Sequence, residues 1–279
     1  MTKLPITLRA ILAGFLIAAA TANVWLLLLL NLGVQLAIVV EAIFLPFFLW
    51  WACGGGPPSA THAARAKAFR RVKLTSKQWS WGLTGALFFA VTVHASIVLL
   101  FRFVSYPAAA FRHGYDLSFI PSMNLRWIVV VVSAASAAIC EEIGFRGFMQ
   151  QPIEQRHGAS IAILISSFLF MALHLTKAWA SLGMVPIVFG AGILLGLLAW
   201  SAASLIPGII GHFVMDVGLF AYWWTGIAGD FTARPISETG VDRSFLIACC
   251  LFATSLVVVL LAILRLRQAS SADARTRSA

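Results

Sequence analysis

Two adjacent glutamates lie at the end of a very apolar run of the sequence. In the stretch "CEEIGFRG" they are Glu141 and Glu142, and Arg146 follows the first of them by five positions. A charged side chain at the centre of a membrane helix costs on the order of 2.5–3.5 kcal/mol, so such residues need a reason to be there. The three side chains could form an ion-pair clip between helices, or they could supply a general base and its support.

Later apolar runs contain ionisable residues at helical spacing. His212 and Asp216 are four positions apart, so on a helix they share one face, and Phe170 and His174 have the same spacing. Each histidine taken alone could be a hydrogen-bonded core residue. Together with the glutamates, the histidines and Asp216 predict a shared site.

The chain order predicts that Glu141 and His174 face each other. A turn is expected near His157–Gly158, with Pro152 helping to end the helix before it. Glu141 precedes that turn by about as many residues as separate the turn from His174, so both lie at similar depth if the two helices run back from it. His212 and Asp216 are expected at the same depth, in the cytoplasmic half of a bilayer.

Peptide hydrolysis would use these residue types. A carboxylate such as Glu141 can accept a proton from water, and the reaction also needs an acid for the leaving amine and donors for the oxyanion. A second interpretation has Glu141, His174 and His212 as three ligands of Zn²⁺, with water in the fourth position. The sequence contains no HExxH zinc motif, no GxSG serine loop and no GxGD aspartyl motif.

The composition indicates a polytopic membrane protein. Of the 279 residues, 61% are hydrophobic and 11% are charged, and the mean hydropathy is +0.92, whereas a soluble domain is about 45–50% apolar and about 25% charged. Apolar runs near the length of about 20 residues that a membrane helix needs predict an all-α bundle of about eight spans. The first is predicted to be a retained span and not a signal peptide, because its apolar run continues past any cleavage point. The spans are Ala10–Leu30, Val34–Trp51, Trp79–Phe103, Arg126–Met149, Ser160–Leu175, Val185–Trp200, Leu205–Trp224 and Phe245–Leu264.

Basic residues predict the orientation. With both termini in the cytoplasm, 14 of the 20 Lys and Arg residues fall on the cytoplasmic side. The net charge of +10 is then explained by topology and by contact with anionic lipid headgroups, so nucleic acid is not expected as a partner. We predict a bacterial plasma (inner) membrane protein.

The expected organisation has four parts. Residues 1–51 form a two-helix membrane hairpin, 52–78 a basic cytoplasmic linker, 79–266 a six-helix body and 267–279 a disordered cytoplasmic tail. Glu41 and His94, also in apolar runs, are expected to bond a neighbouring helix or to lie near an interface. The four cysteines show no CxxC spacing, and no disulfide framework is expected.

In their order, the motifs "EEIGFRG", "FMALH" and "HFVMD" (EExxxR, FxxxH and HxxxD/N) resemble the CAAX protease and bacteriocin-processing family, known as CPBP or Abi. The resemblance covers about 126–224. It implies an intramembrane endopeptidase with a cytoplasm-facing cavity, described in this family both as a metalloprotease and as a metal-free glutamate protease. It also implies that Glu141 and His174 activate water, that His212 and Asp216 stabilise the oxyanion, and that Glu142, Arg146 and Phe170 support them.

Some alternatives remain open at this stage. No cofactor is favoured, with Zn²⁺ as the alternative. The expected partners are the lipid bilayer and a peptide or protein substrate, with a prenylated C-terminal cysteine as one option. A non-catalytic membrane scaffold or bacteriocin-immunity protein of the same fold is the alternative function, and a proton-coupled transporter is a third, for which buried Glu and His are also natural.

Overall fold

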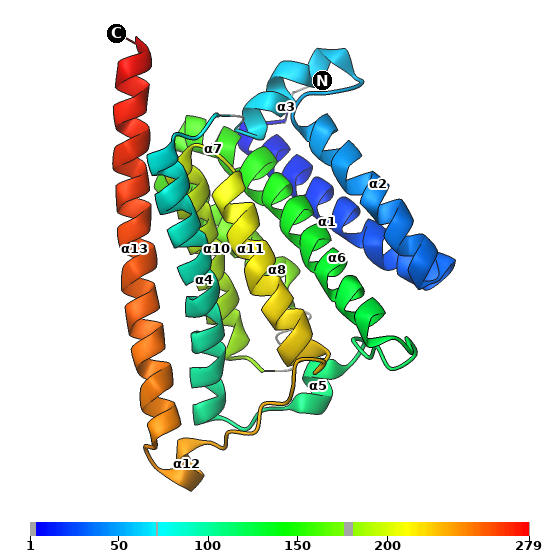
Figure 1. Cartoon of the computed structure of the whole chain (residues 1–279). Helices are drawn as coiled ribbons and strands as arrows, with labels where there is room; N and C mark the ends of the chain where they lie inside the picture. Colours follow the sequence, from blue (N-terminus) through cyan, green and yellow to red (C-terminus); the bar gives the residue numbers. More distant parts are fainter. Residues whose placement is uncertain (1–3, 71, 176–180, 279) are drawn as a thin grey trace.

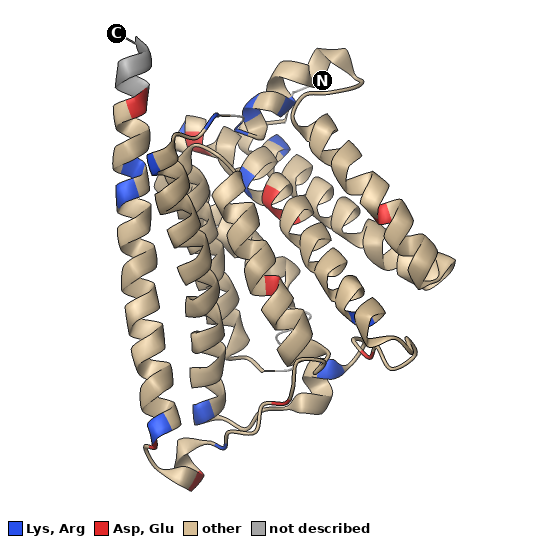
Figure 2. Cartoon of the chain, in the orientation of Figure 1, with Lys and Arg blue, Asp and Glu red and all other residues tan. Residues whose placement is uncertain are grey.

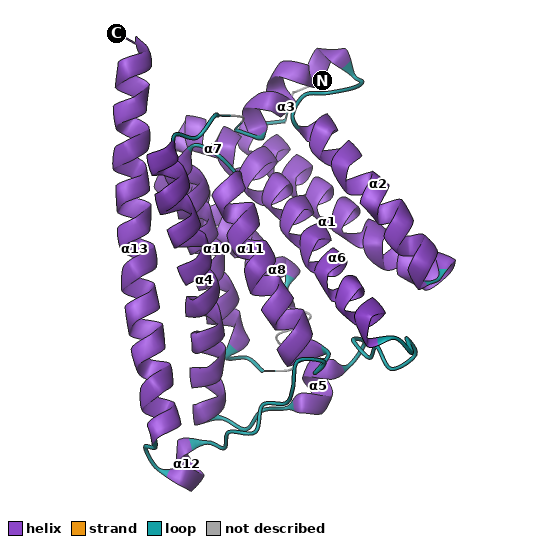
Figure 3. Ribbon diagram, viewed as in Figure 1, coloured by secondary structure: helices purple, strands orange, loops and turns teal. Residues whose placement is uncertain are grey.

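The long helices of the chain form one bundle, and the two ends of the chain lie at the same end of it (Figures 1 and 3). The structure is a computed structural model that describes residues 4–70, 72–175 and 181–278, and no strand occurs within these ranges. The end of the bundle with the chain termini is called the termini face below. The opposite end, which carries α5 (Ala108–Arg112) and α12 (Ile236–Thr239), is called the loop face.

Seven helices are long and apolar enough to cross a membrane within the described ranges. An eighth apolar helix, α8 (Ala159–Leu173), has only 15 residues. The predicted all-α polytopic architecture is therefore confirmed, with every expected span found as a helix and the fifth shorter than expected. The seven are α1 (Ile6–Leu32), α2 (Val34–Ala52), α4 (Ser76–Phe103), the continuous α6–η2–α7 (Met123–Glu142, Ile143–Gln150, Gln151–His157), α10 (Met184–Ala202), α11–η3 (Ile206–Gly218, Leu219–Trp224) and α13 (Arg243–Ser278).

Local sequence signals set several helix ends. Thr75 and Gln78 form a capping box at the start of α4, in which each side chain satisfies the other residue's backbone N–H. The turn between α7 and α8 lies at Gly158, whose φ of 84° suits glycine. Pro152 does not end the preceding helix, contrary to expectation. It lies in the first turn of α7, directly after the π-helical η2, where a missing N–H costs little.

Glycines let the helices approach closely around the centre of the bundle. A Cβ on Gly14 of α1 would lie 2.6 Å from the carbonyl oxygen of Gly144 in η2, so α1 packs directly on the segment that follows the two glutamates. A Cβ on Gly211 of α11 would lie 3.1 Å from Ala86 of α4. The predicted N-terminal hairpin thus packs on the remaining helices, while its separation as a domain stays a prediction.

The linker between α2 and α4 contains η1 (Ser59–Thr61) and a short basic helix, α3 (His62–Ala68). Arg65 was expected to face lipid headgroups, but it is buried. Its guanidinium donates to the carbonyl oxygens of Trp51, Gly55 and Gly56 at 2.6–2.7 Å. These carbonyls converge only because the glycine-rich turn after α2 folds back on itself.

The tail after residue 266 was expected to be disordered, but α13 continues as a helix to Ser278. Its last described side chains contact the bundle. The hydroxyl of Ser270 donates to the carbonyl oxygen of Ser201 at 2.8 Å, and the guanidinium of Arg267 lies 4.2 Å from the ring centroid of Trp200. These contacts, which link segments distant in sequence, explain the added helical turns.

Candidate active site

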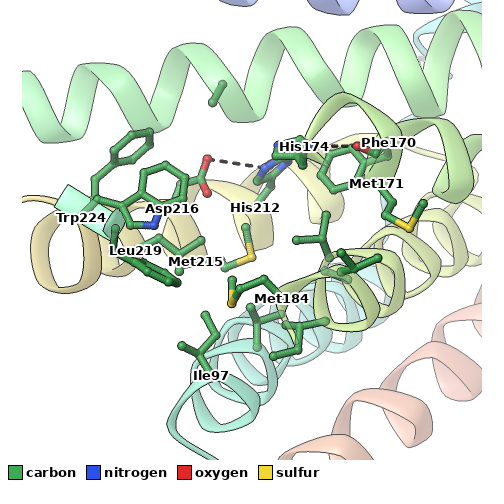
Figure 4. A pocket seen from close by; sticks show the side chains of 18 of the residues that line it. Ile97, Phe170, Met171, His174, Met184, His212, Met215, Asp216, Leu219 and Trp224 are labelled. Atoms are coloured by element: carbon green, nitrogen blue, oxygen red, sulfur yellow. Dashed lines mark hydrogen bonds and ion pairs between the residues drawn. The ribbon is translucent and has the colours of Figure 1, made fainter. Parts of the chain in front are cut away.

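Three helices bring the predicted site residues together near the middle of the bundle. Glu141 is the last but one residue of α6, His174 follows the last residue of α8, and His212 and Asp216 lie on α11. In Figure 4 the Asp216 carboxylate and the imidazole rings of His174 and His212 point toward one another across a cavity. The spacing of residues around the turn at Gly158 therefore predicted the meeting of α6 and α8 correctly.

Glu141 is the carboxylate that faces both histidines. Its Oε2 lies 3.7 Å from Nε2 of His174 and 4.0 Å from Nε2 of His212. The residue is 8% exposed and lines the cavity. These distances exceed a direct hydrogen bond, so a water between these atoms would bridge them.

The orientation of His174 is fixed by its own helix. Its Nδ1 lies 2.8 Å from the carbonyl oxygen of Phe170. Because a carbonyl only accepts, Nδ1 carries the proton, and the lone pair of Nε2 faces Glu141 when the ring is neutral. The Phe170 ring lies 4.5 Å from the His174 ring and 4.5 Å from the guanidinium of Arg146, centroid distances that place it as a packing support for both.

A buried ion pair holds His212. Its Nδ1 lies 3.0 Å from Oε1 of Glu142, and the same oxygen accepts a 2.9 Å hydrogen bond from Nη1 of Arg146. The side chains of Glu142 and Arg146 are fully buried, and that of His212 is 2% exposed. Arg146 also donates to the carbonyl oxygen of Gly192 at 3.1 Å. Glu142 and Arg146 are thus placed beside His212, and their supporting role stays a prediction.

Asp216 completes the group one helical turn after His212. Its Oδ2 lies 3.5 Å from Nε2 of His212, as the spacing of four predicted. The remaining direction from His212 Nε2 is toward Glu141 and the cavity. A small reacting group between Glu141 and Asp216 would therefore contact His212.

A zinc ion at this site would need three ligand side chains arranged around one point. Among the described residues no group of three His, Cys, Asp or Glu side chains has the arrangement to hold a metal ion. The side chains of Glu141, His174 and His212 do not form such a group.

The cavity beside these residues has a volume of about 280 Å³ and a mainly apolar wall. Its residues come from α4, α6, α8, α10 and α11, and from the segment 110–115 at the loop face. The site was expected to open on the same face as both chain termini. The structure places the cavity between the site and the loop face, so the two expectations, cytoplasmic termini and a cytoplasm-facing cavity, do not hold together.

His94 and Glu41 lie outside this group. Nε2 of His94 lies 3.1 Å from the carbonyl oxygen of Met215, and the indole N–H of Trp223 donates to Nδ1 at 3.2 Å. His94 therefore bonds a neighbouring helix, as predicted. Glu41 is fully buried on α2 near Ser136 of α6, away from the cavity lining.

Sequence reasoning missed two features around the site. Gln150 is fully buried and donates to the carbonyl oxygen of Gly196 at 3.0 Å, parallel to the bond from Arg146 to Gly192. The π-helical segments η2 and η3 follow α6 and α11, the two helices that carry the site's carboxylates. The recurring glycines in "EEIGFRG" could have indicated a close approach, but nothing in the sequence specifies the wider helical turn.

One comparison with known proteins bears on this geometry. The family model described as type II CAAX prenyl endopeptidase Rce1-like matches residues 121–218. The matched segment runs from the loop before α6 to the end of α11 and contains all the site residues above. No curated protein and no solved structure matches the chain. The family match confirms the resemblance to the CAAX protease and bacteriocin-processing family, and it supports a CAAX-type intramembrane protease acting on a peptide or protein substrate at the lipid bilayer.

Proposed function

We propose that the protein is an endopeptidase that hydrolyses a peptide bond inside the membrane, with Glu141 as the general base. The observation that carries the proposal is the position of Glu141 Oε2, which faces Nε2 of both histidines at the wall of an apolar cavity. A carboxylate at that position can accept a proton from a bound water, because such a water can donate a direct hydrogen bond to it.

The attacking water would be held by two acceptors. Glu141 Oε2 accepts one of its protons, and Nε2 of His174, which bears a lone pair when the ring is neutral and Nδ1 donates to Phe170, accepts the other. The water oxygen then attacks the carbonyl carbon, and the proton moves to Glu141. His174 acts by orienting the water, so its removal lowers the rate at each substrate concentration.

The oxyanion forms on the side of His212 and Asp216. His212 donates its Nδ1–H to Glu142, so Nε2 carries a proton only in the doubly protonated ring; in that form the Nε2–H points at the cavity and donates to the oxyanion. Asp216 donates to the same oxygen when it is protonated. Collapse of the tetrahedral intermediate breaks the C–N bond, and Glu141 returns its proton to the leaving amine.

The proposed route needs no metal, and this is tested with chelators. The apolar wall suits a substrate with an apolar group beside the scissile bond. A prenyl chain on a C-terminal cysteine is one such group, and a run of apolar side chains is another. The proposed location is a bacterial plasma membrane with both chain termini in the cytoplasm.

The decisive experiment is cleavage of quenched peptides by the purified protein in detergent, with one set farnesylated at a C-terminal CaaX cysteine. We expect cleavage by wild type and by Glu238→Gln, a control at an exposed carboxylate on α12. Cleavage should be lost in Glu141→Gln and His174→Ala, and a zinc chelator should have no effect. Cleavage that persists in Glu141→Gln would refute the mechanism.

The Glu141→Gln variant also distinguishes an enzymatic function from that of a non-catalytic scaffold or immunity protein. Glu141→Gln keeps the size of the side chain and is expected to keep the fold, as measured by its melting temperature in detergent. A scaffold function would survive this substitution in cells, whereas a function that depends on hydrolysis would not.

A further inference from the structure

The lining of the cavity extends from the site toward the loop face. The residues that line it farthest from the site belong to segments at that face: Phe111 and His113 at α5, Tyr115 in the loop that follows, and Trp224 at the end of η3. Figure 1 shows α5 and the adjacent loops opposite both ends of the chain. A substrate that enters along this lining arrives from the loop face.

The site is closed toward the termini face. Glu142 and Arg146 are fully buried directly behind Glu141, and Gln150 is fully buried one turn further. Neighbouring segments pack closely beside them: a Cβ on Gly147 would lie 3.0 Å from the carbonyl oxygen of Ala68, and one on Gly208 would lie 3.1 Å from Oε2 of Glu142. Among the described residues, these side chains and contacts occupy the space between Glu141 and that face.

Exposed basic residues gather on the termini face. Figure 2 shows Lys and Arg there on the linker, on α7 and on α13 a few turns before its end. The loop face carries fewer basic residues; those described there are Arg102, Arg112, Arg126, Arg234 and Arg243. The exposed residues of the termini face are Arg9, Lys67, Lys73, Lys77, Arg156, Arg265 and Arg267.

Short loops rich in Lys and Arg remain in the cytoplasm during membrane insertion, largely regardless of acidic residues. The distribution therefore assigns the termini face to the cytoplasm. From these three observations we propose that the cavity opens on the extracytoplasmic face and that the substrate is a peptide segment presented there. This inference rests on the proposed peptidase function for its substrate but not for its orientation.

The inference narrows the substrate class. A prenylated cysteine at the end of a cytoplasmic protein would reach Glu141 only if the chain were inserted the other way round. An exported peptide, or a membrane-anchored protein whose cleavable segment lies outside, reaches it in the proposed orientation.

Cysteine accessibility tests the orientation without any need for activity. In a background with all four native cysteines replaced by alanine, one cysteine is placed on each face at an exposed serine: Ser237→Cys on α12 and Ser59→Cys in η1. Intact bacterial cells that express each variant are treated with a membrane-impermeant maleimide, before and after lysis. Ser118→Cys, in the exposed loop after α5, is a second reporter for the loop face.

We expect Ser237→Cys and Ser118→Cys to be labelled in intact cells, and Ser59→Cys only after lysis. Labelling of Ser59→Cys in intact cells would overturn the inference, as would labelling of the two loop-face variants only after lysis. Neither result would bear on whether the site hydrolyses peptides.

Cleavage by membrane vesicles of known sidedness distinguishes the proposed orientation from the proposed peptidase function. A hydrophilic quenched peptide that cannot cross the membrane is added to right-side-out and to inverted vesicles, with Glu141→Gln vesicles as the blank. Cleavage in right-side-out vesicles alone supports both proposals. Cleavage in inverted vesicles alone overturns the orientation and leaves the peptidase function intact.

Discussion

Nδ1 of His212 lies 3.0 Å from Oε1 of Glu142, the carboxylate oxygen that Arg146 also binds. In the proposed mechanism the second glutamate of the motif is therefore a support and not a second base. It is committed to an arginine on its own helix and to a histidine on α11, so it couples the positions of two helices to the orientation of one imidazole. This explains how two adjacent glutamates in the same apolar run can have different roles.

Removal of Arg146 is expected to destabilise the fold. Arg146→Met would leave Glu142 buried without its charged partner, and breaking a buried pair in this way costs about 3–5 kcal/mol. The free energy of unfolding in detergent measures the effect. Arg156→Met, at an exposed arginine on α7, is the matched control and should change it little. Equal stabilities of the two variants would contradict a structural role for the pair.

Two substitutions of Asp216 distinguish a role as hydrogen-bond donor to the oxyanion from a role in packing alone. Asp216→Asn keeps the size of the side chain and supplies an amide donor at every pH, so it should retain cleavage with a flatter pH profile. Asp216→Leu removes the donor, and kcat should fall by about 10²–10³. Steady-state kinetics of both variants measure kcat and KM separately. A change in KM alone would mean that Asp216 binds substrate and does not stabilise the transition state.

Substitution of glycine by alanine tests the close packing of α1 on η2. A Cβ at Gly14 would lie 2.5 Å from Cβ of Met149, so Gly14→Ala must shift one helix and should cost about 1–3 kcal/mol. Gly190→Ala is the control, because no atom lies within 4 Å of its added Cβ. The better helix propensity of alanine should make this variant as stable as wild type or more stable, by at most about 1 kcal/mol. Thermal melts in detergent would refute the packing if they ranked the variants in the reverse order.

The loop face should lose stability in acid. Arg102 binds the Asp242 carboxylate through both oxygens, with further hydrogen bonds from the Phe245 N–H and the Ser244 hydroxyl, and together they lower the pKa of Asp242. A carboxyl whose pKa is lower in the folded state stabilises it above the unfolded pKa of about 3.9, and this contribution disappears as the pH falls below that value.

Asp242→Asn should remove that dependence. Melting temperatures of wild type and variant, measured from pH 6 downward, should differ most near neutral pH and converge in acid. A constant difference across the range would show that the carboxylate charge is not the cause.

The parts of the site that depend on short-range periodicity could be predicted from the sequence. The spacing of His212 and Asp216 is a property of any α-helix, and their ion-pair distance of 3.5 Å follows from it. The meeting of Glu141 with His174 needed only one further fact, the position of the turn between their helices. The apolar runs predicted the helices for the same reason, since hydropathy over about 20 residues is a local quantity.

Features made by distant segments could not be predicted in this way. The basic residue Arg65 looked like a topology signal, but its carbonyl partners come together only when the turn after α2 closes. Gln150 and its bond to Gly196 depend on the packing of η2 against α10. The face on which the cavity opens depends on which helix ends are filled by neighbouring side chains, and no single segment carries that information.

The length of α8 has a consequence for the lipid around the protein. Its 15 residues span about 22 Å at 1.5 Å per residue, which is less than the roughly 30 Å of a typical hydrocarbon core. Such a mismatch is accommodated by local thinning of the bilayer. His174 directly follows the last residue of this short helix. We therefore expect the headgroup region to lie closer to His174 than it would beside a helix of full length. The hydrolytic water would then have only a short apolar distance to cross, although the site lies near the middle of the bundle.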